Sequence, residues 1–254
     1  MKVLISPAKT IDIKAIENTK DISVAHFLKE SNQLINKLKK LSIKKIEELM
    51  HVSTDLATIN HLRFQNWMEP TEWSDKVSPA VFAFNGEVYK GFDAQSLTEE
   101  QLETAQKTVR ILSGLYGVLK PMDLIFPYRL EMGTKWSITP NQKNLYQFWG
   151  KKLSLFLNNE MEKEEVIINL ASNEYFKAID LKHLKQPIIT PVFKEFKNGE
   201  YKIVMMYAKH ARGAMARYIV TNNIVRPEEL KLYAIDGYLF DINQSTENEW
   251  VFTR

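Results

Sequence analysis

The spacing of apolar residues predicts that the first third of the chain is largely helical. From Val24 to Leu41 apolar side chains recur at helical spacing, and Ser42 then stands where an N-cap would begin a further helix. Ahead of this region, Met1 to Pro7 holds a short apolar run broken by proline, which is typical of a buried strand. We therefore expect an initial strand followed by several helices.

The middle of the chain predicts alternating strands and helices. Short apolar runs at 79–84 and 166–170 are typical of buried strands. Thr98 with Gln101 three residues later has the spacing of a capping box, so we expect a helix from Thr98 to Leu112. A further helix is expected over 145–158.

The last quarter predicts a hairpin, a helix and a closing pair of strands. Asn198-Gly199 separates two strand-like runs and is a strong β-hairpin signal. A helix is expected over 208–222, and strands at 238–241 and 250–252. Neither an internal repeat nor a Pro/Gly/Ser-rich linker divides the chain, so one domain over residues 1–254 is expected, with two small domains as the alternative.

Composition narrows the classes of function. The sequence contains no cysteine, which excludes disulfides, thiolate metal sites and cysteine nucleophiles and fits a reducing compartment. Its five histidines form no metal-binding motif, so neither a metal nor a cofactor is expected. With no secretory signal pattern and no long apolar run, we expect a cytoplasmic protein without membrane contact.

Charge is distributed unevenly along the chain. The formal net charge is only +3, but residues 175–217 carry nine Lys or Arg against three acids, and residues 29–45 carry six lysines against one glutamate. A lysine-rich helix face is often simply solvated. The first of these segments nevertheless indicates a partner with negative charge.

Two clusters could bind an anion. Ser6 to Thr10 follows the first strand and places Lys9 between hydroxyl groups, although an ordinary polar turn would look the same. Lys209 to Arg217 puts cations near a helix start, where they oppose the helix dipole. A bound anion or an acidic neighbour would explain this second cluster, and solvated side chains are the alternative.

Two further segments place polar groups next to a predicted strand or loop. Asn169, Ser172 and Glu174 follow an apolar strand and could project into a cleft at a sheet edge, or Ser172 could cap a helix. Arg129 and Glu131 lie two residues apart and could form an internal ion pair or face the same cleft.

Six motifs together closely resemble the bacterial YaaA family of peroxide-stress proteins. They are ISPAKT (5–10), LSGLYGVLKPMDL (112–124), PYRLEMG (127–133), LYQFWG (145–150), NLASNEYF (169–176) and KHARGAMARYI (209–219). The resemblance implies a cytoplasmic protein that limits free iron, and so oxidative damage, during peroxide stress. It also implies an α+β fold, here expected as a mixed sheet flanked by helices, with a positively charged cleft.

The resemblance further implies DNA binding through a helix-hairpin-helix-like element, expected here over Thr98 to Leu124. Such hairpins offer backbone N–H groups to phosphate without reading bases. The residues expected to contact DNA phosphate are Lys9, Gly114, Gly117, Lys120, Arg129, Lys177, Lys209, Arg212 and Arg217. The polar cleft candidates are Ser6, Glu131, Asn169, Ser172 and Glu174.

Two hypotheses of function follow. In the first, a monomer binds double-stranded DNA without sequence specificity, with strong salt dependence, and has no enzymatic activity. In the second, the protein is an enzyme acting on a phosphorylated or nucleotide-like small molecule. Lys9, Arg129, Arg212 and Arg217 would then hold the anion, and Glu131 or Glu174 would be the general base, with no reaction assigned.

Overall fold

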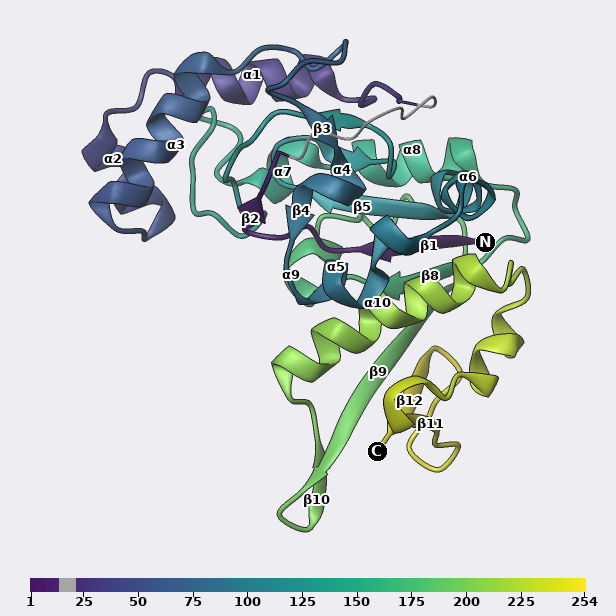
Figure 1. Cartoon of the computed structure of the whole chain (residues 1–254). Coiled ribbons are helices and arrows are strands. Elements are labelled where there is room, and N and C mark those ends of the chain that lie inside the picture. Colours follow the sequence, from purple (N-terminus) through teal and green to yellow (C-terminus); the bar gives the residue numbers. More distant parts are fainter. Residues whose placement is uncertain (14–21) are drawn as a thin grey trace.

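A mixed sheet forms the centre of the computed structural model, which describes residues 1–13 and 22–254 (Figure 1). The strand order is β11-β12-β9-β8-β1-β5-β6, and β10 pairs with β9. The strands are β1 (Lys2–Ile5), β5 (Val109–Ser113), β6 (Gly117–Leu119), β8 (Ile167–Leu170), β9 (Ile188–Lys197), β10 (Glu200–Lys202), β11 (Leu239–Phe240) and β12 (Glu249–Thr253).

Strand β1 lies between two parallel neighbours, β5 and β8. Val3, Leu4 and Ile5 are fully buried, since both faces of a central parallel strand are covered. Burying each of these side chains stabilises the fold by about 1.5–3 kcal/mol. In the register with β8, Ile5 lies opposite Leu170, so the carboxyl ends of β1 and β8 meet at one edge of the sheet.

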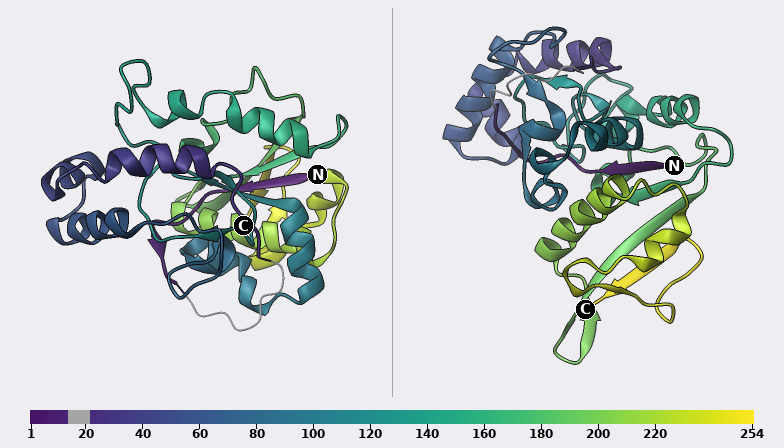
Figure 2. Two further views of the ribbon diagram at one scale, coloured as in Figure 1. Left: turned by 90° about the horizontal axis from the view of Figure 1, so that it is seen from above. Right: turned by 45° about the vertical axis from the view of Figure 1, so that its right-hand side comes forward.

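Helices cover the sheet on both sides. Seen from above, α7 and α8 lie on one side and α5, α6 and α10 on the other (Figure 2). This arrangement confirms the expected α+β architecture of a mixed sheet flanked by helices. The helices are α4 (Ala80–Ala83), α5 (Glu87–Phe92), α6 (Glu99–Thr108), α7 (Leu145–Trp149), α8 (Lys152–Glu160), α9 (Asn173–Phe176) and α10 (Met205–Thr221), with short 3₁₀ turns at Ala94–Ser96, Pro227–Leu232 and Ile235–Gly237.

Three helices follow the first strand, as the apolar spacing predicts. They are α1 (Leu28–Leu38), α2 (Ile43–Met50) and α3 (Thr54–Asn66). The expected N-cap is confirmed, because the Lys45 amide donates to the Ser42 hydroxyl at 3.3 Å. None of the helices in the described part of the chain is long and apolar enough to cross a membrane.

The capping box at Thr98 is confirmed, but the helix that it starts is shorter than expected. Helix α6 ends at Thr108, and the next five residues form β5 because they pair with β1. The tertiary pairing decides the structure of this apolar segment, which is compatible with a helix or a buried strand.

The expected helix-hairpin-helix element is wrong for the same reason. Gly114 to Gly117 connects two antiparallel strands, β5 and β6, rather than two helices. Both glycines are buried: a side chain at Gly114 would collide with the Leu130 carbonyl, and Gly117 has a φ of +70°. Buried backbone amides cannot meet DNA phosphate, so Gly114 and Gly117 are structural residues.

Two other sequence predictions need correction. The run 79–84 forms a turn of helix, α4, between the two-residue strands β3 (Ser78–Pro79) and β4 (Phe84–Asn85), because a short apolar run does not distinguish a buried strand from a buried helix. The helix expected over 145–158 is divided into α7 and α8 at Gly150, whose φ is +49°. The remaining two-residue strands are β2 (Thr10–Ile11), which pairs with β4, and β7 (Leu124–Ile125), which pairs with β3.

The hairpin at Asn198-Gly199 is confirmed. Both residues have positive φ, +57° and +83°, as the favoured two-residue turn requires. Strands β9 and β10 extend this hairpin away from the body of the molecule (Figure 1). The second strand ends at Lys202, and α10 begins three residues later, earlier than the sequence pattern predicts.

Helices α5 and α10 approach each other unusually closely. A Cβ atom at Gly213 of α10 would lie 1.8 Å from the Val88 carbonyl oxygen, and one at Gly91 of α5 would lie 2.2 Å from the His210 carbonyl oxygen. Only glycine permits such backbone contact. The contact holds the second and third turns of α10 against the whole length of α5.

Candidate functional site

A cavity of about 270 Å³ opens where β1 and β8 end. Such a position, beyond the carboxyl ends of adjacent parallel strands, is where ligands commonly bind in sheets of this kind. Four parts of the chain form its walls: the loop after β1 (residues 6–10), the turn into α5 (85–89), the segment after β8 (170–175) and one face of α10. Glu131 completes the lining.

Ser6 and Ser172 join the loops that leave the two strands. The Ser172 amide donates to the Ser6 hydroxyl at 2.8 Å, and that hydroxyl donates to the Ser172 hydroxyl oxygen at 3.2 Å. Ser172 is at the N-cap position of α9, but its side chain does not cap the helix. The Ser172 hydroxyl proton has no acceptor among the described residues, so it can be donated to a molecule in the cavity.

Glu131 is held by two cations. Its carboxylate lies 2.8 Å from the Lys9 amine and 2.9 Å from a terminal nitrogen of Arg129. The buried Arg129 Nε has no hydrogen-bond partner within the described residues. The internal ion pair expected between Arg129 and Glu131 is therefore confirmed, and Lys9 extends it to the cavity wall.

Glu174 is the second carboxylate that enters from this side. One of its carboxylate oxygens accepts the Gly133 amide at 2.9 Å, and its main-chain carbonyl accepts the Tyr146 hydroxyl at 2.9 Å. These two bonds fix the position of the residue. The other carboxylate oxygen has no bonded partner in the described chain and can face a ligand.

Helix α10 contributes Lys209 and Arg212 to the lining of the cavity. Lys209 is exposed, whereas Arg212 is half-buried. Burial lowers the pKa of the Arg212 guanidinium, and no nearby carboxylate offsets this effect. An arginine nonetheless stays protonated at neutral pH, so the cavity contains a partly desolvated positive charge.

The helix-dipole reasoning for these cations does not hold in the structure. Helix α10 begins at Met205, which places Lys209 and Arg212 in its second and third turns. The dipole acts mainly within the first turn, so it does not disfavour them. What makes Arg212 unusual is instead its burial without a counter-ion.

Two buried tyrosines form much of the remaining wall. Tyr89 donates its hydroxyl to the Ser6 carbonyl at 3.1 Å, and Tyr175 lies on α9. Burial raises the pKa of both phenols well above the ordinary value, so they are neutral at physiological pH. They offer ring surface rather than charge to a ligand.

The cavity as a whole is balanced in charge. Its lining has three cations and three carboxylates: Lys9, Lys209 and Arg212 against Glu87, Glu131 and Glu174. The structure therefore does not show the expected positively charged cleft at this place.

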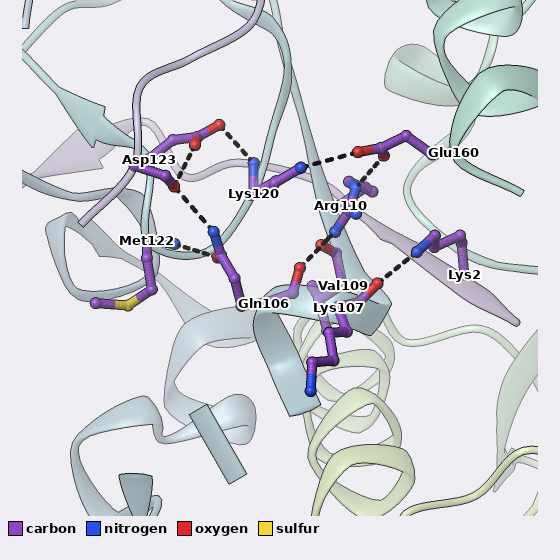
Figure 3. Close-up of polar contacts among 10 residues, drawn as sticks. Lys2, Gln106, Lys107, Val109, Arg110, Lys120, Met122, Asp123 and Glu160 are labelled. Carbon is purple, nitrogen blue, oxygen red and sulfur yellow. Dashed lines mark hydrogen bonds and ion pairs between the residues drawn. The ribbon is translucent and has the colours of Figure 1, made fainter. Parts of the chain in front are cut away.

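Several residues expected at one cleft lie elsewhere. Lys120 pairs with Glu160 at 3.0 Å, in a network where Arg110 binds the same carboxylate at 2.6 Å (Figure 3). Lys177 is exposed and borders a separate hollow beside α7. Arg217 donates to two main-chain carbonyls at the end of α5, at 3.0 and 2.7 Å, so it stabilises that helix end.

Asn169 supports the cavity from behind. It is buried in β8, where its side-chain oxygen accepts the Ala171 amide at 3.1 Å and its amide donates to Thr190 at 3.3 Å. It positions the turn that carries Ser172 and does not line the cavity.

The sequence patterns missed the contribution of residues 85–89. Asn85-Gly86 follows an apolar run, as the polar residues of the Ser6 and Ser172 segments do, but an Asn-Gly pair is equally typical of a simple turn. Its placement depends on β4 pairing with β2, which brings Asn85 opposite Thr10. Among the described residues, no group of three or more His, Asp or Glu side chains could hold a metal ion.

Comparison with known proteins identifies the family. The model of the family described as peroxide stress protein YaaA matches residues 1–244. The chain belongs to the YaaA family. UPF0246 proteins are similar over their whole length: that of Shewanella sp. strain ANA-3 is 49% identical over 256 residues, covering 100% of this chain and 99% of the relative. That of Flavobacterium psychrophilum is 46% identical over 254 residues, covering 100% of each.

The segments that carry the YaaA resemblance converge on the cavity. Residues from ISPAKT, PYRLEMG, NLASNEYF and KHARGAMARYI all line it, although they are far apart in the sequence. The fold of this YaaA-family member therefore gathers four of the six motifs around one small space.

Proposed function

We propose that this member of the peroxide-stress family binds a small phosphorylated or nucleotide-like molecule in the cavity described above. Arg212 carries the proposal, because it is a half-buried guanidinium without an anionic partner in the described part of the chain. A desolvated charge without a counter-ion is costly, and an anionic ligand would offset that cost. Arginine also matches the geometry of phosphate oxygens.

The size of the cavity supports a small ligand. At about 270 Å³ it is slightly smaller than the roughly 300–1,000 Å³ typical of pockets for drug-sized molecules. A mononucleotide or a phosphorylated metabolite is of suitable size, whereas duplex DNA is far too wide. Neutral tyrosines, hydroxyls and fixed carboxylates around the cation are more than nonspecific phosphate contact requires.

Glu174 suits the role of a general base better than Glu131. Both Glu131 oxygens are occupied by Lys9 and Arg129, so neither is free to accept a proton from a ligand. Glu174 has an unoccupied oxygen next to the space. Arg217, expected among the anion-binding groups, lies outside the cavity and is not part of the proposed site.

Calorimetric titration of orthophosphate and a set of mononucleotides tests the proposal. We expect Arg212→Gln to weaken binding at least tenfold, as loss of a charge-assisted bond to phosphate should. The free variant should be as stable as the wild type, because the change removes an unpaired buried charge. Arg226→Gln is the matched control, since Arg226 is exposed and pairs with Glu229.

Two results would contradict the proposal. The first is the absence of binding by every anion in the set to folded wild-type protein. The second is binding that Arg212→Gln leaves unchanged, because the anion would then occupy another place.

DNA binding is the second candidate function, supported by the surface of the β9–β10 hairpin. Phe196 and Tyr201 are exposed there, 60% and 43%, with ring centroids 5.1 Å apart. Lys197 and Lys202 alternate with these rings along the two strands and therefore project from the other face of the hairpin, where Lys202 pairs with Glu200 at 2.9 Å. A two-stranded ribbon of this kind fits the major groove of duplex DNA, where the rings on one face can contact bases and the lysines on the other can contact phosphate.

Fluorescence anisotropy with duplex and single-stranded DNA over a salt series tests this candidate. If Lys197 and Lys202 each contact one phosphate of duplex DNA, replacing both with Gln should reduce the slope of log K against log salt by about 1.8. Replacing the exposed Lys40 and Lys44 removes the same charge from a distant surface and should leave the slope unchanged. Equal binding by wild type and the hairpin variant would exclude this surface.

A further inference from the structure

Some of the charged groups that line the cavity have an ion-pair partner and others have none. Glu131 is neutralised by Lys9 and Arg129, and Glu87 by Lys90 at 2.6 Å. Two half-buried charges are left without an ion-pair partner among residues 1–13 and 22–254. They are the Glu174 carboxylate and the Arg212 guanidinium.

These two groups do not neutralise each other. They line the same cavity, but no ion pair joins them, and the lowered pKa of Arg212 shows no influence of a carboxylate. The Gly133 amide holds the Glu174 carboxylate at 2.9 Å, and the Tyr146 hydroxyl holds the main-chain carbonyl of the same residue at 2.9 Å. A positive and a negative charge thus line one cavity of about 270 Å³ without forming an ion pair.

An inorganic anion would satisfy only one of them. Phosphate at Arg212 would leave the second oxygen of the Glu174 carboxylate without a donor and would add negative charge to the same small space. A ligand with an amino group at its other end would donate to the unoccupied oxygen of Glu174. Both uncompensated charges would then be hydrogen-bonded at once.

We infer that the occupant of the cavity is an amino-bearing phosphorylated small molecule, with its anionic group on Arg212 and its amino group on Glu174. This inference rests on the proposed function and specifies its ligand class. The Ser172 hydroxyl is available as a further donor to the anionic end. Tyr89 and Tyr175 provide neutral ring surface for the part of the ligand between the two ends.

Matched ligand pairs that differ in one amino group test the inference. Adenosine 5′-monophosphate with inosine 5′-monophosphate is one pair, and glucosamine 6-phosphate with glucose 6-phosphate is another. The wild type should bind the amino-bearing member of at least one pair roughly tenfold to hundredfold more tightly, as a charge-assisted bond in place of an unpaired carboxylate implies.

Variants assign the discrimination to a residue. In Glu174→Gln the side-chain oxygen that accepts the Gly133 amide is kept, so the fold is preserved while the charge is lost. The variant should then bind the two members of each pair about equally. Glu87→Gln is the matched control, because this carboxylate already pairs with Lys90, and it should keep the preference.

The possible failures are distinguishable. Arg212-dependent binding without any preference for the amino-bearing member, or a preference that survives in Glu174→Gln, would overturn this inference and leave the proposed function standing. No binding by any of the four ligands to folded protein would overturn both.

Discussion

Replacing Gly213 with alanine tests the close contact between α5 and α10 on which the cavity depends. The added Cβ would lie 1.8 Å from the Val88 carbonyl oxygen and 2.9 Å from the Phe92 amide nitrogen. These are main-chain atoms in a buried helix, so they cannot rotate away as a side chain could. The helices must therefore move apart.

The size of the effect follows from two opposing contributions. Alanine in place of glycine within a helix gains about 1 kcal/mol from helix propensity alone. Restoring a carbon–oxygen contact of roughly 3.5 Å requires the helices to move apart by roughly 1.7 Å. Overpacking of this kind typically costs about 1–3 kcal/mol, and a main-chain obstacle places Gly213 at the upper end.

The expected net loss is therefore about 2 kcal/mol in the free energy of unfolding, or roughly 4–8 °C in Tm for a chain of this size. Urea denaturation monitored by circular dichroism measures it. Lys209→Gly compared with Lys209→Ala gives the propensity contribution at an exposed site in the same helix, where alanine should be about 1 kcal/mol more stable.

Gly213→Ala as stable as the wild type would refute this reasoning. It would mean that the helices can separate without cost. Gly91→Ala provides a second variant of the same contact, because its Cβ would lie 2.2 Å from the His210 carbonyl oxygen. Both variants should also weaken ligand binding, since α10 carries Arg212.

Three further changes test the polar interactions. Burial would raise the pKa of Glu160, but Arg110 and a neighbouring lysine lower it overall. Glu160→Gln should therefore cost about 3 kcal/mol in the free energy of unfolding, measured by urea denaturation at neutral pH. This difference should vanish as the pH falls through the pKa of Glu160 in the folded protein. Burial raises the pKa of Asp123, so the contribution of this residue to stability should fall as the pH rises through its pKa in the folded protein. The free energy of unfolding, measured between about pH 3 and 7, should show this loss in the wild type and not in Asp123→Asn. Arg217→Met keeps the apolar stem but loses both bonds to the carbonyls at the end of α5, and it should lose about 1 kcal/mol by thermal unfolding, whereas unchanged Tm would show that those bonds are dispensable.

Local signals in the sequence correctly predicted those features whose conformation is set by residues close to one another in the chain. Ser42, Thr98 and Asn198-Gly199 act through bonds or backbone angles within a few residues, and all three have the predicted roles. The segments 79–84 and 109–113 were predicted wrongly because their apolar runs contain no local information on whether they pair with a strand.

The candidate site was predicted in part. Ser6, Lys9, Glu131, Ser172 and Glu174 line the cavity, and so do Lys209 and Arg212, while the other phosphate-binding candidates lie elsewhere. A cation in a sequence has the same appearance whether it caps a helix, as Arg217 does, or pairs with a carboxylate, as Lys120 does. Only the partners in space separate these roles.

The sequence by itself determined the family, the helical first third, the hairpin and the segments that could carry chemistry, because each depends on short-range patterns or on the identity of motifs. The tertiary structure decided which segments meet. Pairing of β1 with β8 and the glycine contact between α5 and α10 bring Ser6, Ser172, Glu174 and Arg212 to one cavity. The tertiary structure also decided which charges of that cavity are buried and which are paired, because a charge is buried or paired only when distant parts of the chain come into contact.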